Sequence, residues 1–305
     1  MRPPRVRTLV AVVLLLALTG CRLGAPPRIP YADGTTYVEP GGERTPIHGQ
    51  DKIGISEVMA YADGLLVADT RWFEGSVGLA YVHGRQRTQL GPCSTNGGRP
   101  SPDRSQVAWL TTGCPEASLV AETVLHVADT DGSGGWTREL DQHSLLNTVG
   151  FVGDAVVVSG YRDPVRLVPE TGPVAVVPHL RHAVATHGTL VAGERGVVDL
   201  ASGRLLWWAP RTYLRSFSPD GRLIVAFQRG DNVLLDARTG ALHATLPRRL
   251  DRLTWEDSRH LLAVTWGRGR EAMVRIGVDG RTALVAPVRP VPPRQPYRYV
   301  LETQP

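Results

Sequence analysis

The fold of this 305-residue chain is decided by the stretch Leu214–Leu246, LRSFSPDGRLIVAFQRGDNVLLDARTGALHATL. Within it, Ser218-Pro219-Asp220-Gly221 has the composition of a turn, because proline fixes φ, aspartate bonds its own backbone and glycine tolerates positive φ. Residues 223–227 and 232–236 are mostly apolar runs, separated by the turn residues Arg229-Gly230-Asp231. The stretch therefore predicts four short antiparallel strands joined by three turns.

The strand at 223–227 is apolar on both of its alternating faces, which predicts that neighbouring layers cover both sides. A unit of about 33 residues cannot supply those layers itself, so stacked copies of the unit are expected. Five further units follow the same pattern, at 54–91, 98–141, 147–178, 182–209 and 251–286. Their period of about 39 residues is close to that of propeller blades. The sequence predicts an all-β propeller of four-stranded antiparallel blades, with six blades favoured and seven as the alternative.

Sequence motifs add a family resemblance. Ser218-Pro219-Asp220-Gly221-Arg222 and the weaker Ser101-Pro102-Asp103-Arg104 resemble the SPDG motif of the WD40-like bacterial β-propellers, a family that includes the TolB propeller. The segment 126–132 followed by Arg138-Glu139-Leu140 is similar to the strand-turn-strand pattern of that family. The resemblance covers about half of the repeat region. It implies a propeller fold and no particular activity, because one fold serves many functions.

The N-terminal residues predict export. Arg2, Arg5 and Arg7 precede an apolar run, Leu9–Leu18, which is too short to span a bilayer and is typical of a signal peptide over residues 1–20. The junction Leu18-Thr19-Gly20-Cys21 resembles the lipobox of bacterial lipoproteins. That resemblance implies that Cys21 is lipidated and holds the protein on the extracytoplasmic face of the cell membrane. The alternative is an ordinary signal peptide that happens to contain a cysteine.

The remaining boundaries follow from composition. Residues 21–50, with the lipidated Cys21, are rich in proline, glycine and charge and are interpreted as a tether. The propeller is expected over 51–286, followed by a proline-rich tail over 287–305. A ring must close to remove its open strand edges. We therefore expect Thr35–Val38 or Tyr297–Leu301 to complete the closing blade; if both join an extra sheet, the ring has seven blades.

The small net charge of the chain does not favour nucleic acid as a binding partner. Without the three arginines of the signal peptide, the 34 basic residues become 31 against 29 acidic ones, a net charge of +2. A charge this small, with arginine scattered through turns, does not predict binding to nucleic acid or to an acidic membrane.

Two cysteines remain once Cys21 is assigned to lipid. Cys93 and Cys114 flank a hairpin-like segment, and an exported chain meets oxidising conditions, so a disulfide between them is predicted. Closing this loop would stabilise the fold by about 3 kcal/mol on the chain-entropy model. The alternative is two buried free thiols.

No linear motif for catalysis or for a cofactor occurs in the chain. The segment 129–134 partly matches a calcium loop but lacks glutamate at the twelfth position, so a hairpin turn is favoured. The sequence places His179, His182 and His187 near one another without a metal-binding pattern. We therefore predict no metal site and no cofactor. The tryptophans of the repeats are expected to pack mostly between blades, with one or two facing the central mouth; they are Trp207, Trp208, Trp255 and Trp266.

These observations favour a non-catalytic binding or protein-interaction module of the cell envelope, because the loops of a rigid propeller frame suit recognition. The expected partner is a protein or an envelope glycan. The alternative is an envelope enzyme, a glycan-active hydrolase or lyase, whose site lies in the central mouth. Two carboxylates, or a histidine and a carboxylate, facing one another there would favour the enzyme.

Overall fold

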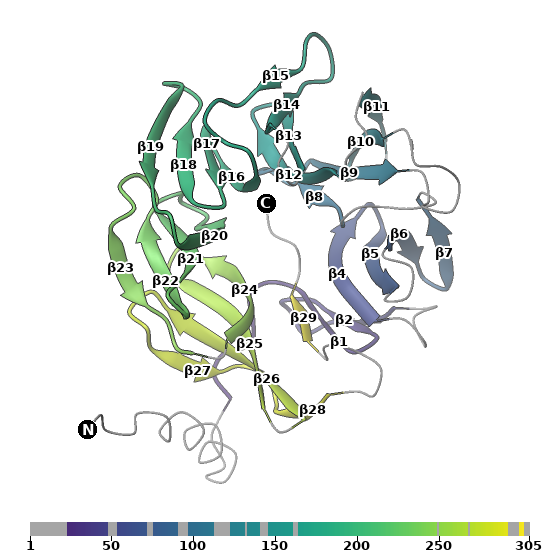
Figure 1. Cartoon of the computed structure of the whole chain (residues 1–305). Coiled ribbons are helices and arrows are strands. Elements are labelled where there is room, and N and C mark those ends of the chain that lie inside the picture. The colour runs from purple at the N-terminus through teal and green to yellow at the C-terminus, as the bar shows by residue number, and fades with distance from the viewer. Residues whose placement is uncertain are drawn as a thin grey trace, which may run out of the picture.

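The computed structural model describes residues 23–47, 54–71, 76–90, 97–112, 123–131, 133–140, 146–160, 164–248, 250–267, 269–291 and 299–301. Every regular element in these ranges is a β-strand. The strands form seven antiparallel sheets, which stand around a central axis as the blades of a propeller (Figure 1). No helix in the described ranges is long and apolar enough to cross a membrane.

Six blades are continuous in sequence, and each predicted unit corresponds to one of them. In each of them the first strand is innermost. Their strands are β4 (Gly54–Tyr61), β5 (Gly64–Arg71), β6 (Ser76–His83) and β7 (Gln86–Gln89); β8 (Arg99–Pro100), β9 (Gln106–Thr112), β10 (Thr123–Asp129) and β11 (Gly135–Leu140); β12 (Leu146–Val152), β13 (Ala155–Gly160), β14 (Arg166–Val168) and β15 (Ala175–Val176); β16 (Ala183–His187), β17 (Leu190–Gly193), β18 (Gly196–Asp199) and β19 (Arg204–Trp208); β20 (Thr212–Phe217), β21 (Leu223–Gln228), β22 (Asp231–Asp236) and β23 (Leu242–Thr245); and β24 (Leu250–Asp257), β25 (His260–Gly267), β26 (Arg270–Gly277) and β27 (Thr282–Leu284). The short strand β28 (Arg289–Pro290) also pairs with β26.

Both ends of the chain build the seventh blade. Its strand order is β29-β1-β2-β3, from β29 (Tyr299–Leu301), β1 (Tyr31–Asp33), β2 (Thr36–Val38) and β3 (Arg44–Pro46). The C-terminal β29 is the innermost strand and pairs antiparallel with the N-terminal β1. Residues 31–46, interpreted from composition as part of a tether, therefore belong to the ring.

The preference for six blades is wrong, and the ring has seven. Counting repeats finds only units that are continuous in sequence, whereas the seventh is divided between residues 31–46 and 299–301. Its strands have three residues each, which is too short for an alternating pattern to be recognised. The condition stated for seven blades, that both terminal segments join one extra sheet, is met.

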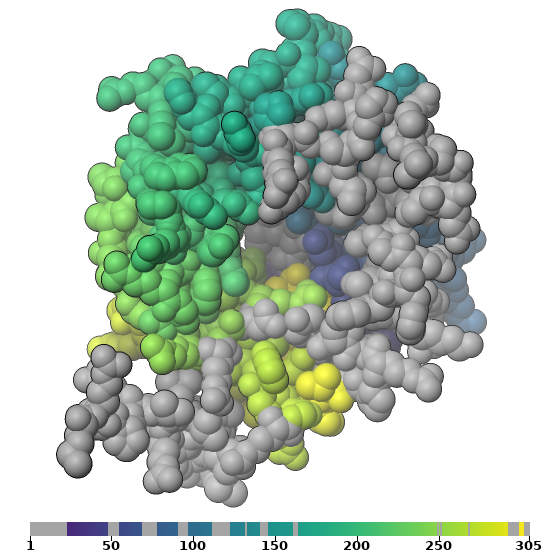
Figure 2. Space-filling model, viewed as in Figure 1, coloured from purple at the N-terminus to yellow at the C-terminus, as the bar shows by residue number. Residues whose placement is uncertain are grey.

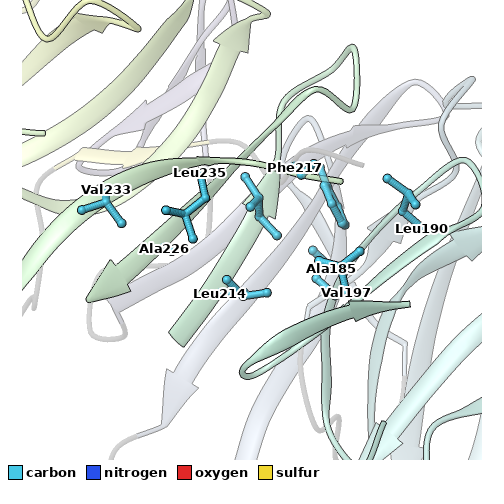
Figure 3. Packing of buried hydrophobic residues seen from close by; sticks show 11 residues of the cluster. Ala185, Leu190, Val197, Leu214, Phe217, Ala226, Val233 and Leu235 are labelled. Carbon is cyan, nitrogen blue, oxygen red and sulfur yellow. The ribbon is translucent and has the colours of Figure 1, made fainter. Parts of the chain in front are cut away.

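Among the described residues, the hydrophobic core consists of seven clusters, one between each pair of neighbouring blades. Figure 3 shows the cluster between the β16–β19 and β20–β23 blades, where Phe217 lies close to the side chains of the preceding blade. In β21, Ile224 and Ala226 belong to this cluster, while Val225 belongs to the cluster on the other side. The prediction that this strand is covered on both faces is confirmed.

Deleting residues 295–305 removes β29 and is expected to lower the thermal unfolding temperature strongly. Tyr299, Val300 and Leu301 are all buried, and burial of each large apolar side chain contributes about 1.5–3 kcal/mol. That loss is a large part of the total stability of an ordinary domain, about 5–15 kcal/mol. Circular dichroism melting measures the effect, with deletion of residues 303–305 alone as the control. An unchanged melting temperature for the longer deletion would show that β29 does not hold the ring closed.

Candidate functional site

The innermost strands surround a central channel, and five of them contain a β-bulge. The register shifts occur in β4, β12, β16, β20 and β24. An extra residue in one strand bends it and redirects side chains, which is why bulges are common beside binding sites. Six residues at these bulges line the channel: Ser56, Val149, Val184, Arg215, Ser216 and Arg252. A second irregularity of β24, at Glu256, is not part of the channel lining. The bulges therefore determine the chemistry of the channel wall.

The channel has a volume of about 750 Å³, and Figure 2 shows the molecule hollowed near its centre. One arc of the wall is apolar and comes from β12 and β16, with Val149, Phe151 and Val184. Cationic side chains line the wall beyond this arc, on the blades of β20, β24 and β8. The four arginines are Arg99, Arg104, Arg215 and Arg252. The channel thus has an apolar arc on one side and four arginines elsewhere on its wall, among apolar and polar side chains and Glu57.

Two of these arginines form contacts that shape the channel. Arg99 Nη1 lies 2.8 Å from Glu57 Oε2, so the neighbouring inner strands β8 and β4 are joined by an ion pair. Arg252 Nη1 donates a 2.7 Å hydrogen bond to the carbonyl oxygen of Ser56. Ser56 lies on β4, so this bond links β24 to β4 across the closing blade. The Arg252 contact therefore supports ring closure and also places a guanidinium group beside the channel.

Glu57 is the only carboxylate among the described residues that line the channel, and Arg99 neutralises it. His187 also lines the channel; burial lowers its pKa, and the charge of Asp220 partly opposes that shift. The Asp220 carboxylate is engaged in its own turn, where Ser218 Oγ donates to it at 2.6 Å. These neighbours give the channel side chains suited to holding a ligand, and they do not bring two carboxylates together.

The two SPDG-type turns stand at one mouth of the channel and have the same internal hydrogen bonds. In each, the serine Oγ donates to the aspartate Oδ1 at 2.6 Å and accepts a backbone N–H at 2.9 Å, for Ser218 as for Ser101. The fourth residue has a positive φ in both, +66° at Gly221 and +60° at Arg104. A Cβ atom on Gly221 would also lie 2.1 Å from the His187 ring. Glycine is therefore required at position 221. The turn that begins at Ser101 instead has Arg104 at the corresponding position, and this arginine lines the channel.

Several residues singled out from the sequence are not brought together. Cys21, Cys93 and Cys114 lie outside the described residues, so lipidation and the disulfide remain predictions. Asp129 ends β10, which pairs antiparallel with β11, the next strand, as the hairpin interpretation predicts. Within the described part of the chain, no group of three histidine, cysteine or acidic residues is arranged to hold a metal ion.

The histidines and tryptophans have separate environments. His187 borders the channel, whereas His182 Nδ1 lies 3.2 Å from Glu194 Oε1. Trp207 and Trp255 join neighbouring blades, because their Nε1 atoms donate to Ala237 O and Ser216 O. The expectation that the tryptophans mostly pack between blades is wrong for the other two: Trp208 and Trp266 are 53% and 62% exposed. Trp208 is the last residue of β19, and Trp266 is the last but one of β25.

The ring defines the chain as a β-propeller, and a solved propeller domain agrees with this class. The chain is similar to the Cps50 (Swd1) β-propeller domain of Myceliophteria thermophila, with 11% identity over 79% of this chain and 88% of that one and a TM-score of 0.50. TolB from Acinetobacter baumannii has 12% identity over 95% and 70% of the two chains, with a TM-score of 0.47. BamB from Moraxella catarrhalis has 16% identity over 74% and 71%, with a TM-score of 0.44.

No protein-family model matches the sequence, and no curated protein matches it either. The similar structures therefore show the fold alone. The channel residues that matter most, the bulge residues of the inner strands, have no signal in a single sequence. A bulge depends on the register between two strands, which appears only when the strands are paired.

The Asp103 turn at the channel mouth is expected to make stability depend on pH. Hydrogen bonds from Ser101 and then from Ser105 lower the pKa of Asp103 to about 2. Because this folded-state pKa lies below the unfolded value of about 3.9, the carboxylate stabilises the fold above about pH 4, and this contribution disappears as the pH falls towards 2. Asp103→Ala should therefore be less stable than the wild type at pH 7, and the difference should shrink between pH 4 and pH 2. Urea unfolding at several pH values measures it, with Asp154→Ala, an exposed turn aspartate, as the control. A difference that stays constant with pH would contradict this role.

Proposed function

We propose that the protein is a lipid-anchored, extracytoplasmic binding module of the cell envelope, without catalytic activity, and that its central channel holds a segment of a protein partner. The observation that carries this proposal is the set of bulges that direct Arg215, Arg252 and Val184 to the channel. Bulges redirect side chains and are common beside binding sites, so the channel wall is interpreted as a binding surface.

The charge of the channel supports binding rather than hydrolysis. A glycoside hydrolase of the ordinary kind needs two carboxylates, one of which has a raised pKa and acts as an acid. In the channel, Glu57 is the only carboxylate among the described lining residues, and Arg99 Nη1 lies 2.8 Å from it. A second carboxylate is therefore missing from the described lining. This arrangement favours the binding module over the envelope enzyme.

The partner chemistry follows from the two sides of the channel. Guanidinium groups bind carboxylates through charge-assisted and often bidentate hydrogen bonds. Arg215 is exposed and lines the channel, whose wall also includes the apolar arc with Val149 and Val184. A protein segment that carries an acidic side chain next to an apolar one would satisfy both sides. We therefore favour an extended protein segment over a neutral glycan as the occupant.

Reversing the charge at Arg215 is expected to abolish partner binding. Arg215→Glu places a carboxylate where the acidic group of the partner would lie, and like charges in a partly desolvated channel repel. Crosslinking on intact cells followed by mass spectrometry compares this variant with the wild type and with Arg204→Glu, an exposed arginine on the outer strand β19. Proteins recovered with the wild type and with Arg204→Glu should be lost with Arg215→Glu. Recovery of the same proteins with a folded Arg215→Glu variant would rule out the channel as the binding site.

Replacing Cys21 tests the anchor independently of the channel. Several acyl chains on one cysteine hold a protein firmly, since each buried CH₂ contributes about 0.8 kcal/mol. Cys21→Ser should therefore move the protein from the membrane fraction to the soluble extracytoplasmic fraction. Cell fractionation and immunoblotting measure this, and Cys93→Ser serves as a cysteine control that should leave the distribution unchanged. A Cys21→Ser protein that stays with the membrane would refute lipidation at this residue.

A further inference from the structure

The chain enters the propeller at the outer edge of the blade formed by β24 to β27. Gly24 N donates a 2.8 Å hydrogen bond to the carbonyl oxygen of Leu284, in the outermost strand β27. Ile29, five residues later, is buried in the cluster that joins this blade to the closing blade. The first described residues are therefore attached to the rim of the ring and do not extend away from it.

An arginine and a buried glutamate hold this entering segment in place. Arg275 Nη1 and Nη2 donate to the carbonyl oxygens of Ala25 and Pro26, at 3.1 and 2.9 Å. The same guanidinium is paired with Glu256, whose side chain is fully buried, and Glu256 Oε1 also accepts the backbone N–H of Arg28 at 2.6 Å. Removing one member of a buried ion pair leaves an uncompensated charge, so breaking this network would be costly. Segment 24–28 is thus fixed on the blade.

The proposed lipid anchor lies very close to this fixed point. Cys21 and Gly24 are separated by three peptide steps, which span at most about 11 Å even when fully extended. We propose that the edge formed by β27, β28 and residues 23–26, here called the anchor rim, lies against the bilayer, so that the channel axis runs along the membrane plane. The proposal rests on the proposed lipidation of Cys21. In this arrangement the propeller lies directly on the membrane, whereas a tether would hold it away from the surface.

The surface near the anchor rim suits a lipid headgroup layer. Trp266, near the end of β25, is 62% exposed, and tryptophan is enriched at membrane–water interfaces because one part of its ring is apolar and another polar. Arg270 and Arg289 are exposed on the paired strands β26 and β28. Each arginine close to an anionic bilayer surface is attracted to it. The local chemistry, rather than the small net charge, thus fits a phospholipid surface.

The orientation predicts which side of the ring is near the membrane. Figure 1 shows β15 across the ring from β27 and β28. Ala283 on β27 and Ala175 on β15 are both exposed residues of outermost strands, so they form a matched pair. Lys52 is the only lysine of the chain, and in a Lys52→Arg background either Ala283→Lys or Ala175→Lys carries the only side-chain amine.

Energy transfer measures the distance of each site from the bilayer. The lipidated full-length variants are labelled with an amine-reactive donor and placed in phospholipid vesicles that contain an acceptor on the lipid headgroup; Lys52→Arg alone gives the background. Transfer from residue 283 should exceed transfer from residue 175 several-fold. Inserting Gly-Ser-Gly-Ser-Gly-Ser between Arg22 and Leu23 should bring the two values together, because the longer connection releases the rim from the surface.

Three results count against the proposal, and each has a different meaning. A protein that floats with the vesicles but shows equal transfer from residues 283 and 175 keeps its anchor and has no preferred orientation. A protein that does not float with the vesicles has no anchor, and both the proposed lipidation and the orientation then fail. A large difference in transfer that persists after the six-residue insertion would show that surface contacts alone orient the ring, and would overturn the role of the short connection.

Discussion

The structure depends on one constraint: each blade is a sheet with two apolar faces, and only the neighbouring blades can cover them. In β21 the side chains of Ile224 and Val225 point to opposite sides and belong to different inter-blade clusters. A single exposed face would leave a large apolar surface in water, at a cost of roughly 25 cal/mol per Å². The ring must therefore close, and the closing blade has to be covered on both sides like any other.

Closure of the ring also brings the inner strands together around the axis, and their contacts shape the channel. Seven inner strands meet around the axis, and the innermost strand of the closing blade, β29, is only three residues long. The hydrogen bond from Arg252 to Ser56 O links the strands on either side of it. Because Arg252 and Ser56 both occupy bulges, the irregular backbone serves closure and channel chemistry together. The entering segment, held by Arg275, adds a contact on the outer edge of the next blade.

Much of the fold could be predicted from local patterns. The turns at Ser101 and Ser218 have the hydrogen bonds that their residues imply, and the strands that follow them are where the apolar runs lie. The seventh blade could not be counted, because its halves are about 250 residues apart and each strand has three residues. The exposure of Trp208 could not be predicted either, since an aromatic residue at a strand end is covered only if the next blade extends far enough.

By itself, the sequence determined the repeating strand pattern and the turn chemistry, and it predicts an export signal, because these depend on residues close together in the chain. Only the tertiary structure decided the number of blades, the set of channel residues and the point at which the chain meets the ring. These depend on strand register and on contacts such as that of Arg275 with Pro26, nearly the whole chain length away. Local preferences act over a few residues, whereas register and ring closure are set by packing among all seven blades.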